Sequence, residues 1–294
     1  MLYKWPIHPV QPQRALSRKR SVRILNLAAI LMGLVALLVF YSMKVEPYWL
    51  QTTQIDLPMR GLPQPFDSYR IVQISDLHLG PYLSGKPLMN AIQRVNALQP
   101  DLVVITGDFF IMGSESYAGE LQTALSQIQA RDGVIASLGN HDHWLDPLLV
   151  RQTLESAGVM VLQDDVTVIR QGDAEIYVAG LDSLYAGMPD LSAVLEKLPL
   201  ESFAILLMHE PDYADQAAAT GRFRLQLSGH SHGGQISLPF FGPLALPGYA
   251  QKYPSGSYRV GVMEVYTNRG IGMNRFWARF NARPEVSLFV LQAE

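Results

Sequence analysis

The run IVQISDLHLG at residues 71–80 decides the fold of this chain. Its first four residues are typical of a buried strand, and Asp76 and His78 follow at the carboxyl end of that strand. This end is where open α/β sheets place their chemistry. A carboxylate and an imidazole two residues apart in extended chain point to the same side, so both can bind one divalent ion. The pair alone is weak evidence, because an Asp-x-His after a strand is more often a capped turn.

The same pattern recurs along the chain. Four later apolar runs each end in Asp, Asn or His; they lie at 102–106, 134–138, 203–208 and 225–228. The side chains delivered at these strand ends are Asp108, Asn140, His141, His209, His230 and His232. Five of the seven histidines belong to these motifs, which leaves only His8 and His143 outside them. The repetition predicts an α/β fold whose strand ends supply one site.

Length and composition limit the alternatives. The 294 residues allow one large α/β domain with an appendage, and the chain can bury a sizeable core. A net charge of −3 and a pI near 6.2 give no reason to expect a nucleic-acid partner. The sequence contains no cysteine, so any metal must be held by imidazole, carboxylate or amide groups. Such ligands suit Mn²⁺, Fe²⁺ or Zn²⁺.

The N-terminal region has the pattern of an uncleaved membrane anchor. Residues 1–23 are polar and basic, and the run that follows is apolar up to Tyr41, interrupted only by Asn26 and Gly33. A span of about 20 residues crosses a bilayer core. The alternatives are a buried helix and a signal peptide, but the run is uniformly apolar and no small-x-small cleavage site follows it. A helix lying along the membrane surface stays open, because the run is short.

Shifts in composition divide the chain into four segments. They are a basic cytoplasmic N-terminus at 1–23, a transmembrane anchor at 24–42, a linker at 43–67 and the main domain at 68–294. Five clustered basic residues precede the anchor and only Lys44 follows it closely, which predicts an N-terminus in the cytoplasm. The chain would then be a single-pass protein of the cytoplasmic (inner) membrane, with its main domain outside the cytoplasm.

Helix and strand patterns alternate through the middle of the chain. Apolar spacing and the capping residues Asp146 and Asp190 predict helices at 88–98, 116–129, 147–157 and 190–198. From residue 225 onward the pattern becomes all-β, with strands expected at 235–246, 259–267 and 286–291. We interpret the apolar run at 238–246 as a pair of buried strands; the alternative is a surface that receives a lipid chain.

The ligand types at the strand ends suit a pair of metal ions. Two ions about 3.5–4 Å apart need one ligand that binds both, and Asp108 is the natural bridge because a carboxylate has two oxygens. The other residues divide between the ions, with Asp76 and His78 on one, Asn140 and His209 on the other, and His230 and His232 split between them. His141 follows a ligand but has no evident metal, so it is the candidate proton donor.

The order of these motifs resembles that of the calcineurin-like metallophosphoesterases. The matching motifs are DLH at 76–78, GD at 107–108, GNHD at 139–142, His209 and GHSH at 229–232, and the match covers about residues 68–292. The anchor and the stretches 75–80, 230–235, 247–249 and 268–272 resemble the membrane-anchored bacterial branch. The resemblance implies a four-layer α/β/β/α sandwich. It also implies that the first metal takes Asp76, His78, Asp108 and His232, and the second takes Asp108, Asn140, His209 and His230.

The activity implied by the resemblance is phosphoester hydrolysis by a hydroxide that bridges the two metals. His141 would be the catalytic proton donor. Arg269, in a glycine-rich loop, is a candidate contact to the substrate phosphate, and the alternative is an arginine that braces the turn. Asp142 either orients His141 or caps the turn after it. His143 and Trp144 either shape the mouth of the site or simply pack.

The substrate stays open at this stage. We expect a phosphodiester, with phospholipids and other cell-envelope compounds among the candidates. The alternative is a UDP-2,3-diacylglucosamine pyrophosphatase-type hydrolase of lipid A synthesis. Two further alternatives are more remote. A non-catalytic binding scaffold of the same fold would have lost ligands, and a hydrolase of amides or carboxylic esters would not need this ordered set of motifs.

Overall fold

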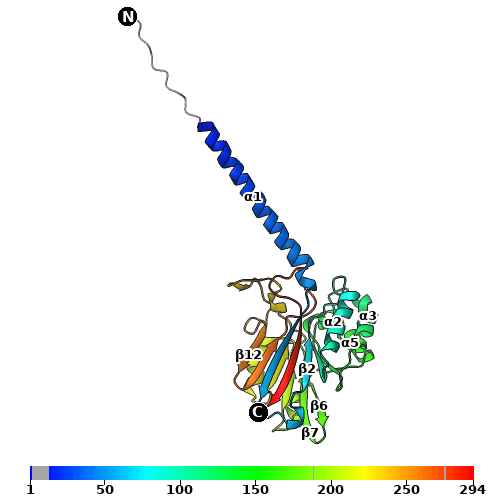
Figure 1. Cartoon of the computed structure of the whole chain (residues 1–294). Coiled ribbons are helices and arrows are strands. Elements are labelled where there is room, and N and C mark those ends of the chain that lie inside the picture. Colours follow the sequence, from blue (N-terminus) through cyan, green and yellow to red (C-terminus); the bar gives the residue numbers. More distant parts are fainter. Residues whose placement is uncertain (2–12, 188, 275) are drawn as a thin grey trace.

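Two six-stranded sheets lie face to face at the centre of the fold (Figure 1). They belong to the part of the chain that the computed structural model describes, residues 1, 13–187, 189–274 and 276–294. The first sheet has the order β1 (Gln51–Met59), β14 (Glu285–Ala293), β2 (Arg70–Ile74), β3 (Leu102–Thr106), β4 (Val134–Ser137) and β5 (Val159–Val161). The second has the order β12 (Gly256–Val260), β13 (Met263–Thr267), β9 (Leu225–Ser228), β8 (Ala204–Leu207), β7 (Ala174–Gly180) and β6 (Asp165–Gln171).

Helices cover the outer face of each sheet. The first sheet is covered by α2 (Lys86–Ala97), α3 (Ala118–Leu125) and α5 (Pro147–Ser156). The second is covered by α6 (Leu191–Lys197) and α7 (Ala214–Ala219). Short helices lie in the connections: α4 (Asn140–Leu145), η1 (Glu46–Tyr48), η2 (Gln64–Phe66), η3 (Glu115–Tyr117), η4 (Pro211–Tyr213) and η5 (His232–Gly234).

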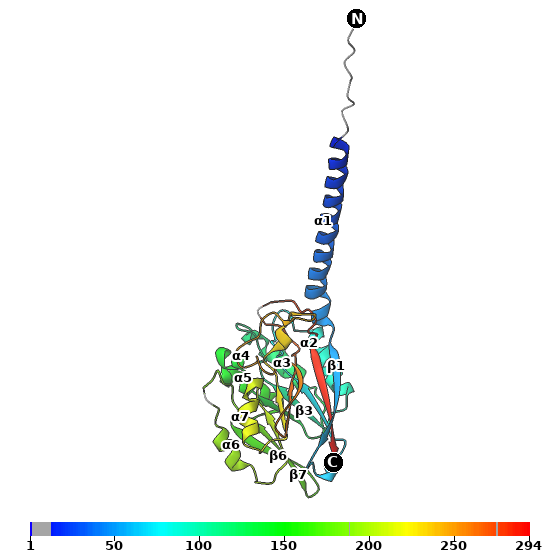
Figure 2. The same cartoon turned by 90° about the vertical axis from the view of Figure 1, so that its left-hand side faces the viewer.

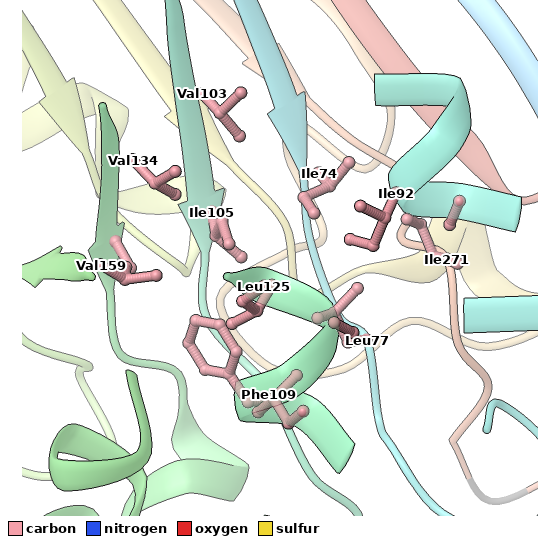
Figure 3. Close-up of a cluster of buried hydrophobic side chains, with 14 of the residues drawn as sticks. Ile74, Leu77, Ile92, Val103, Ile105, Phe109, Leu125, Val134, Val159 and Ile271 are labelled. Carbon is pink, nitrogen blue, oxygen red and sulfur yellow. The ribbon is translucent and has the colours of Figure 1, made fainter. Parts of the chain in front are cut away.

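Alternate residues of the central strands face different layers. Ile74 of β2 packs with Ile92 of α2 and Leu125 of α3 (Figure 3). Ile71, three residues earlier and therefore on the opposite face of β2, packs between the two sheets with residues such as Ile205 of β8. A third cluster lies between the second sheet and its helices. Strands that are apolar on both faces need cover on both sides, and the predicted α/β/β/α sandwich is confirmed.

One long helix, α1 (Gln13–Lys44), projects from the end of this sandwich (Figures 1 and 2). Its apolar part is exposed and long enough to cross a membrane, so α1 is a candidate span. The foot of α1 is joined to the domain: Arg279 donates its backbone N–H to the carbonyl of Ser42 at 2.9 Å, and Ala282 donates to the Glu46 carboxylate at 2.7 Å. Residues 2–12 of the predicted basic N-terminus lie outside the described residues.

Strand directions place α1 and the strand ends at the same end of the domain. Seven residues after α1, β1 begins and pairs parallel with β14, which pairs antiparallel with β2. The strands β2, β3 and β4 are parallel. Their carboxyl ends therefore lie beside the start of β1, next to the foot of α1 (Figure 1).

The structure corrects two of the segment predictions. The linker expected at 43–67 contains β1, which pairs with β14 along its whole length. Prolines suggested a linker, but Pro58 lies in an edge strand, where a missing N–H is tolerated. The buried strand pair expected at 238–246 is also wrong. This stretch forms only the two-residue strands β10 (Ser237–Leu238) and β11 (Gly242–Pro243), and most of its large apolar side chains are exposed.

The remaining elements agree with the sequence within a few residues. Asp146 caps α5 by accepting from the N–H of Leu148, and Asp190 caps α6 by accepting from that of Ala193. The helix expected at 116–129 is shorter and ends at Leu125. The strand expected at 259–267 is a hairpin of β12 and β13 that turns at Gly261, whose φ of +61° is easily adopted only by glycine.

Candidate metal centre

The predicted ligands lie directly after the carboxyl ends of the strands, on strained backbone. Asp76 and His78 follow β2, Asp108 follows β3, and His230 and His232 follow β9. All five have positive φ, between 43° and 69°. A residue with a side chain pays about 1–3 kcal/mol for such a conformation, and it persists only where the surroundings enforce it. The backbone therefore turns each of these side chains toward a common point.

Four side chains form the first cluster. The Nε2 atoms of His78 and His232 are 3.1 Å apart. The Nε2 atom of His232 lies 3.4 Å from Oδ1 of Asp76, and that of His78 lies 3.4 Å from Oδ2 of Asp108. All four residues are buried. They are the residues expected around the first metal.

The second cluster shares Asp108 with the first. Oδ2 of Asp108 lies 3.2 Å from Nε2 of His209, which lies 3.2 Å from Nδ1 of His230. Asn140 begins α4 beside them, and its buried Oδ1 accepts no hydrogen bond from any described residue. A buried amide oxygen without a donor is costly unless something else binds it. This cluster contains the residues expected around the second metal.

Backbone carbonyls fix which imidazole nitrogens face the centre. The Nδ1–H of His209 donates to the carbonyl of Thr106 at 2.6 Å, which leaves the lone pair on Nε2. The Nε2–H of His230 donates to the carbonyl of Gly248 at 2.8 Å, which leaves the lone pair on Nδ1. These are the two nitrogens that approach Asp108 and each other. Both rings are therefore held in the tautomer that a metal needs.

The spacing of these atoms fits bound divalent ions. Nitrogen and oxygen ligands bind such ions at about 2.0–2.2 Å, so neighbouring ligand atoms around one ion lie about 3.0–3.5 Å apart. The separations between neighbouring donor atoms within the two clusters are 3.1–3.4 Å. Two imidazole lone pairs at such a distance repel each other unless a cation or a shared proton lies between them. The donor set and its geometry therefore fit two metal ions.

Burial keeps two of the imidazoles in the neutral form that binds metal. It lowers the pKa of His78 and of His230 to about 3, so both rings are neutral at physiological pH. Burial opposes ionisation of Asp108, but the charge and the hydrogen bond of the protonated form of His209, whose place a bound cation would take, lower the pKa of Asp108 well below its usual range. A carboxylate that stays ionised is what a bridging ligand requires.

Comparisons with known proteins agree with this centre. The sequence model of the family described as "Calcineurin-like phosphoesterase" matches residues 69–234. The metallophosphoesterase YkuE of Bacillus subtilis is 38% identical over 257 residues, which are 86% of this chain and 89% of that protein. The chain is a calcineurin-like phosphoesterase. It is therefore a metal-dependent phosphoester hydrolase.

Two further relatives extend the comparison. The phosphodiesterase YaeI of Escherichia coli is 29% identical to this phosphoesterase over 259 residues, covering 85% of this chain and 92% of that protein. A Danio rerio protein named as a transmembrane protein with a metallophosphoesterase domain is 32% identical over 259 residues, covering 82% of this chain and 57% of that protein.

Asp142 holds two ligand-bearing loops of the phosphoesterase together. Its carboxylate accepts the N–H of Gly139 at 2.8 Å, that of Asp108 at 2.9 Å and that of Phe109 at 2.8 Å. These bonds cap α4 and join the turn after β3 to the turn after β4. Of the two roles weighed for Asp142, the structure shows the capping role.

Close backbone approach explains why glycine is needed at Gly139. A Cβ at that position would overlap the carboxylate of Asp108. In the same way, a Cβ at Gly229 would overlap the side chains of Ser75 and Asp76. The glycines that precede Asn140 and His230 therefore let the ligand loops pack together.

Two residues near the proposed proton donor could not be found from the sequence. The side-chain amide of Asn274 donates to Nε2 of His141 at 2.8 Å. Gln235 holds the Asn274 loop, because it accepts the backbone N–H of Asn274 and donates to the carbonyl of Phe276 at 2.8 Å. Asn274 lies in an irregular loop, where no periodicity or motif distinguishes it. Gln235 ends the motif at 230–235, but nothing in that motif indicates its contact with the Asn274 loop.

The metal centre opens into a cavity of about 670 Å³, a size typical of small-molecule sites. The wall beside the ligands includes His141, and Trp144 and Tyr185 form an aromatic side with their rings 5.6 Å apart. The opposite wall is largely apolar and includes Ile236, Leu244, Ala245, Leu246, Pro247 and Phe276. Trp144 thus shapes the mouth of the site.

Two other residues singled out in the sequence lie away from this cavity. The guanidinium of Arg269 pairs with Glu285 at 3.0 Å, and Arg269 is not among the described residues that line the cavity. Its role as a substrate contact stays a prediction, and the observed pairing is what a turn-bracing arginine would make. His143 pairs with Asp182 at 2.6 Å and likewise does not line the cavity.

Proposed function

We propose that this phosphoesterase binds two divalent ions and hydrolyses phosphodiesters at a membrane. The observation that carries the proposal is the position of Asp108, whose single oxygen Oδ2 lies 3.4 Å from His78 and 3.2 Å from His209. These imidazoles belong to different clusters, so this one carboxylate oxygen would be a ligand of the ion in each cluster. Manganese, iron and zinc all suit the imidazole, carboxylate and amide donors.

The two ions would supply a nucleophile from water at neutral pH and would neutralise charge on the phosphoryl oxygens. Asp76, His78, Asp108 and His232 would hold one ion, and Asp108, Asn140, His209 and His230 the other. Thr106 and Gly248 keep two of the imidazoles in the required tautomer. The apolar wall of the cavity limits access of water to the substrate.

His141 is placed to donate a proton to the leaving oxygen. It lines the cavity, and its ring centroid lies 4.7 Å from that of His78. Its backbone N–H donates to Oδ1 of Asp108 at 2.8 Å, which ties the proton donor to the bridging ligand. The Asn274 amide can present either its NH₂ or its oxygen to the ring, so it can hold His141 in either protonation state.

The membrane address rests on α1 and on the distribution of basic residues. The exposed apolar surface of α1 supports a single membrane span. The excess of Lys and Arg before the span supports a cytoplasmic N-terminus and a catalytic domain outside the cytoplasm. That address favours phosphodiesters of the cell envelope. A UDP-sugar pyrophosphatase, whose nucleotide substrate is cytoplasmic, would require the opposite orientation.

Metal analysis of the purified full chain tests the two-metal proposal. We expect about two transition-metal ions per chain and Mn²⁺-dependent hydrolysis of bis(p-nitrophenyl) phosphate that a chelator abolishes. Asp108→Asn should reduce binding at both sites, and Asn140→Ala mainly at the second. Asp56→Asn, the same chemical change on an exposed residue of β1, is the matched control and should keep both ions. Active enzyme with no more than one tightly bound ion would refute the proposal.

A further inference from the structure

Exposed aromatic side chains gather on two loops beside the mouth of the cavity. Phe240 and Phe241, at the tip of the β10–β11 hairpin, are exposed to 105% and 87% of their reference areas. Phe276 and Trp277, in the loop after β13, are exposed to 66% and 45%. We call these four residues the apolar rim. Soluble proteins rarely expose such a group of large apolar residues without a binding partner.

The two loops of the rim are joined to each other and to α1. Ser237 donates its N–H to the carbonyl of Phe280 at 2.8 Å, and Phe280 donates to that of Gln235 at 2.8 Å. The ring of Phe280 meets the ring of Tyr41, in the last turns of α1, edge-on at 6.5 Å between centroids. The rim is therefore fixed relative to the end of the candidate span.

The level of the membrane surface can be inferred from the foot of α1. Tyr48 and Trp49 follow the helix and are half exposed, and the guanidinium of Arg283 lies 3.7 Å from the Trp49 ring centroid. Aromatic residues and arginine are typical of the head-group region at the end of a span. Figure 1 shows the gold β10–β11 hairpin and the orange loop after β13 at this same end of the domain.

We propose that the apolar rim inserts into the interface of the membrane that α1 spans, so that the metal centre opens toward the lipid head groups. The cavity connects the two, because Phe276 of the rim and Leu244 of the hairpin line it together with Asp108 and His141. A phosphoester on a lipid head group could then reach the centre while its acyl chains stay in the bilayer. The insertion holds for either orientation of α1; only this substrate assignment rests on the proposed function.

The absence of cysteine from the sequence allows a direct test. The full chain is reconstituted in phosphatidylcholine vesicles, with an environment-sensitive dye on a single cysteine introduced by Phe241→Cys. The matched control is Val262→Cys. Val262 is 68% exposed, and it lies in the β12–β13 turn, at the end of the domain opposite the metal centre. Brominated lipids should quench the dye at 241 at least about threefold more than the dye at 262.

A second comparison separates insertion by the rim from insertion driven by the dye. The dye is placed on Leu238→Cys, with Phe240 and Phe241 either native or both changed to Ser. The exposed phenylalanines have no packing role, so the double change should leave folding intact while quenching falls to the level seen at 262. Equal quenching at 241 and 262 would overturn the proposal. So would oxidative cross-linking of two Phe241→Cys chains without quenching, because the rim would then bind a second copy. Quenching requires no catalysis, so it is decided separately from the phosphodiesterase activity.

Discussion

Replacing Asn274 with Ala should weaken the proton donor without removing it. The change deletes one neutral hydrogen bond, 2.8 Å long, from the side-chain amide to Nε2 of His141. The backbone N–H of Asn274 keeps its bond to Gln235, so the loop should stay in place. Such a bond contributes about 1 kcal/mol. If that energy holds the ring in its reactive position, kcat should fall about fivefold, since about 1.4 kcal/mol corresponds to tenfold in rate.

His141→Ala should have a much larger effect of the same kind. General acid catalysis contributes about 10²–10⁴ in rate, and the variant keeps the backbone bond to Asp108 and all the metal ligands. The loss should grow as the leaving group becomes more basic, because a poor leaving group depends more on protonation. The assay is kcat on a series of aryl phosphodiesters, with metal content measured in parallel.

A double variant decides whether Asn274 acts through His141. In the absence of the imidazole the amide has nothing to position, so His141→Ala with Asn274→Ala should be no slower than His141→Ala alone. Asn96→Ala is a matched control, because Asn96 also makes side-chain hydrogen bonds but lies at the end of α2, far from the centre. Additive losses in the double variant, or the same defect of His141→Ala across all leaving groups, would refute this reasoning.

Three other predictions test different parts of the structure. Gly139→Ala should lower metal occupancy and melting temperature because its Cβ would overlap Asp108. Gly119→Ala, whose Cβ meets open space on α3, should lower neither, and an equal loss in both variants would contradict the packing argument. Burial alone would lower the pKa of His143, but the hydrogen bond and charge of Asp182 raise it. The charged pair therefore stabilises the fold at low pH, and this stabilisation is lost as pH rises through the raised pKa of His143. His143→Gln should lower the melting temperature more at pH 6 than at pH 9. Equal decreases at the two pH values would argue against the pair. A C-terminal alkaline phosphatase fusion should be active and a green fluorescent protein fusion dark; the reverse result would place the enzyme in the cytoplasm and favour the UDP-sugar pyrophosphatase.

The sequence predicts which side chains cluster at the candidate metal centre because these residues carry a local signal. Each follows a short apolar strand directly, as Asp76 and His78 follow β2, and parallel strands bring their carboxyl ends to one edge. Asn274 and Gln235 carry no such signal. Asn274 contacts His141 because Gln235 holds its loop at the cavity, and the path of an irregular loop cannot be predicted from periodicity.

The errors in the fold have physical causes of their own. Apolar composition alone cannot distinguish residues buried in a core from residues exposed on a surface. The apolar run at 238–246, which contains Phe240, therefore has the pattern of buried strands although most of it is exposed. Prolines suggested a linker at 43–67, but an edge strand accepts Pro58 because one side of it makes no ladder bonds. The pairing of β1 with β14 also cannot be predicted from local sequence, because Gln51 pairs with Glu285, which is far away along the chain.

That pairing has a consequence for biosynthesis. The strand β14 lies between β1 and β2, so neither neighbour can complete its hydrogen bonds on that side until β14 has left the ribosome. Since α1 is made first, the nascent domain would be tethered beside the bilayer with two open strand edges while the rest is translated. Truncation before Glu285 would leave both edges permanently open. Messages or proteolysis that remove β14 should therefore yield aggregated or degraded protein rather than a smaller active enzyme.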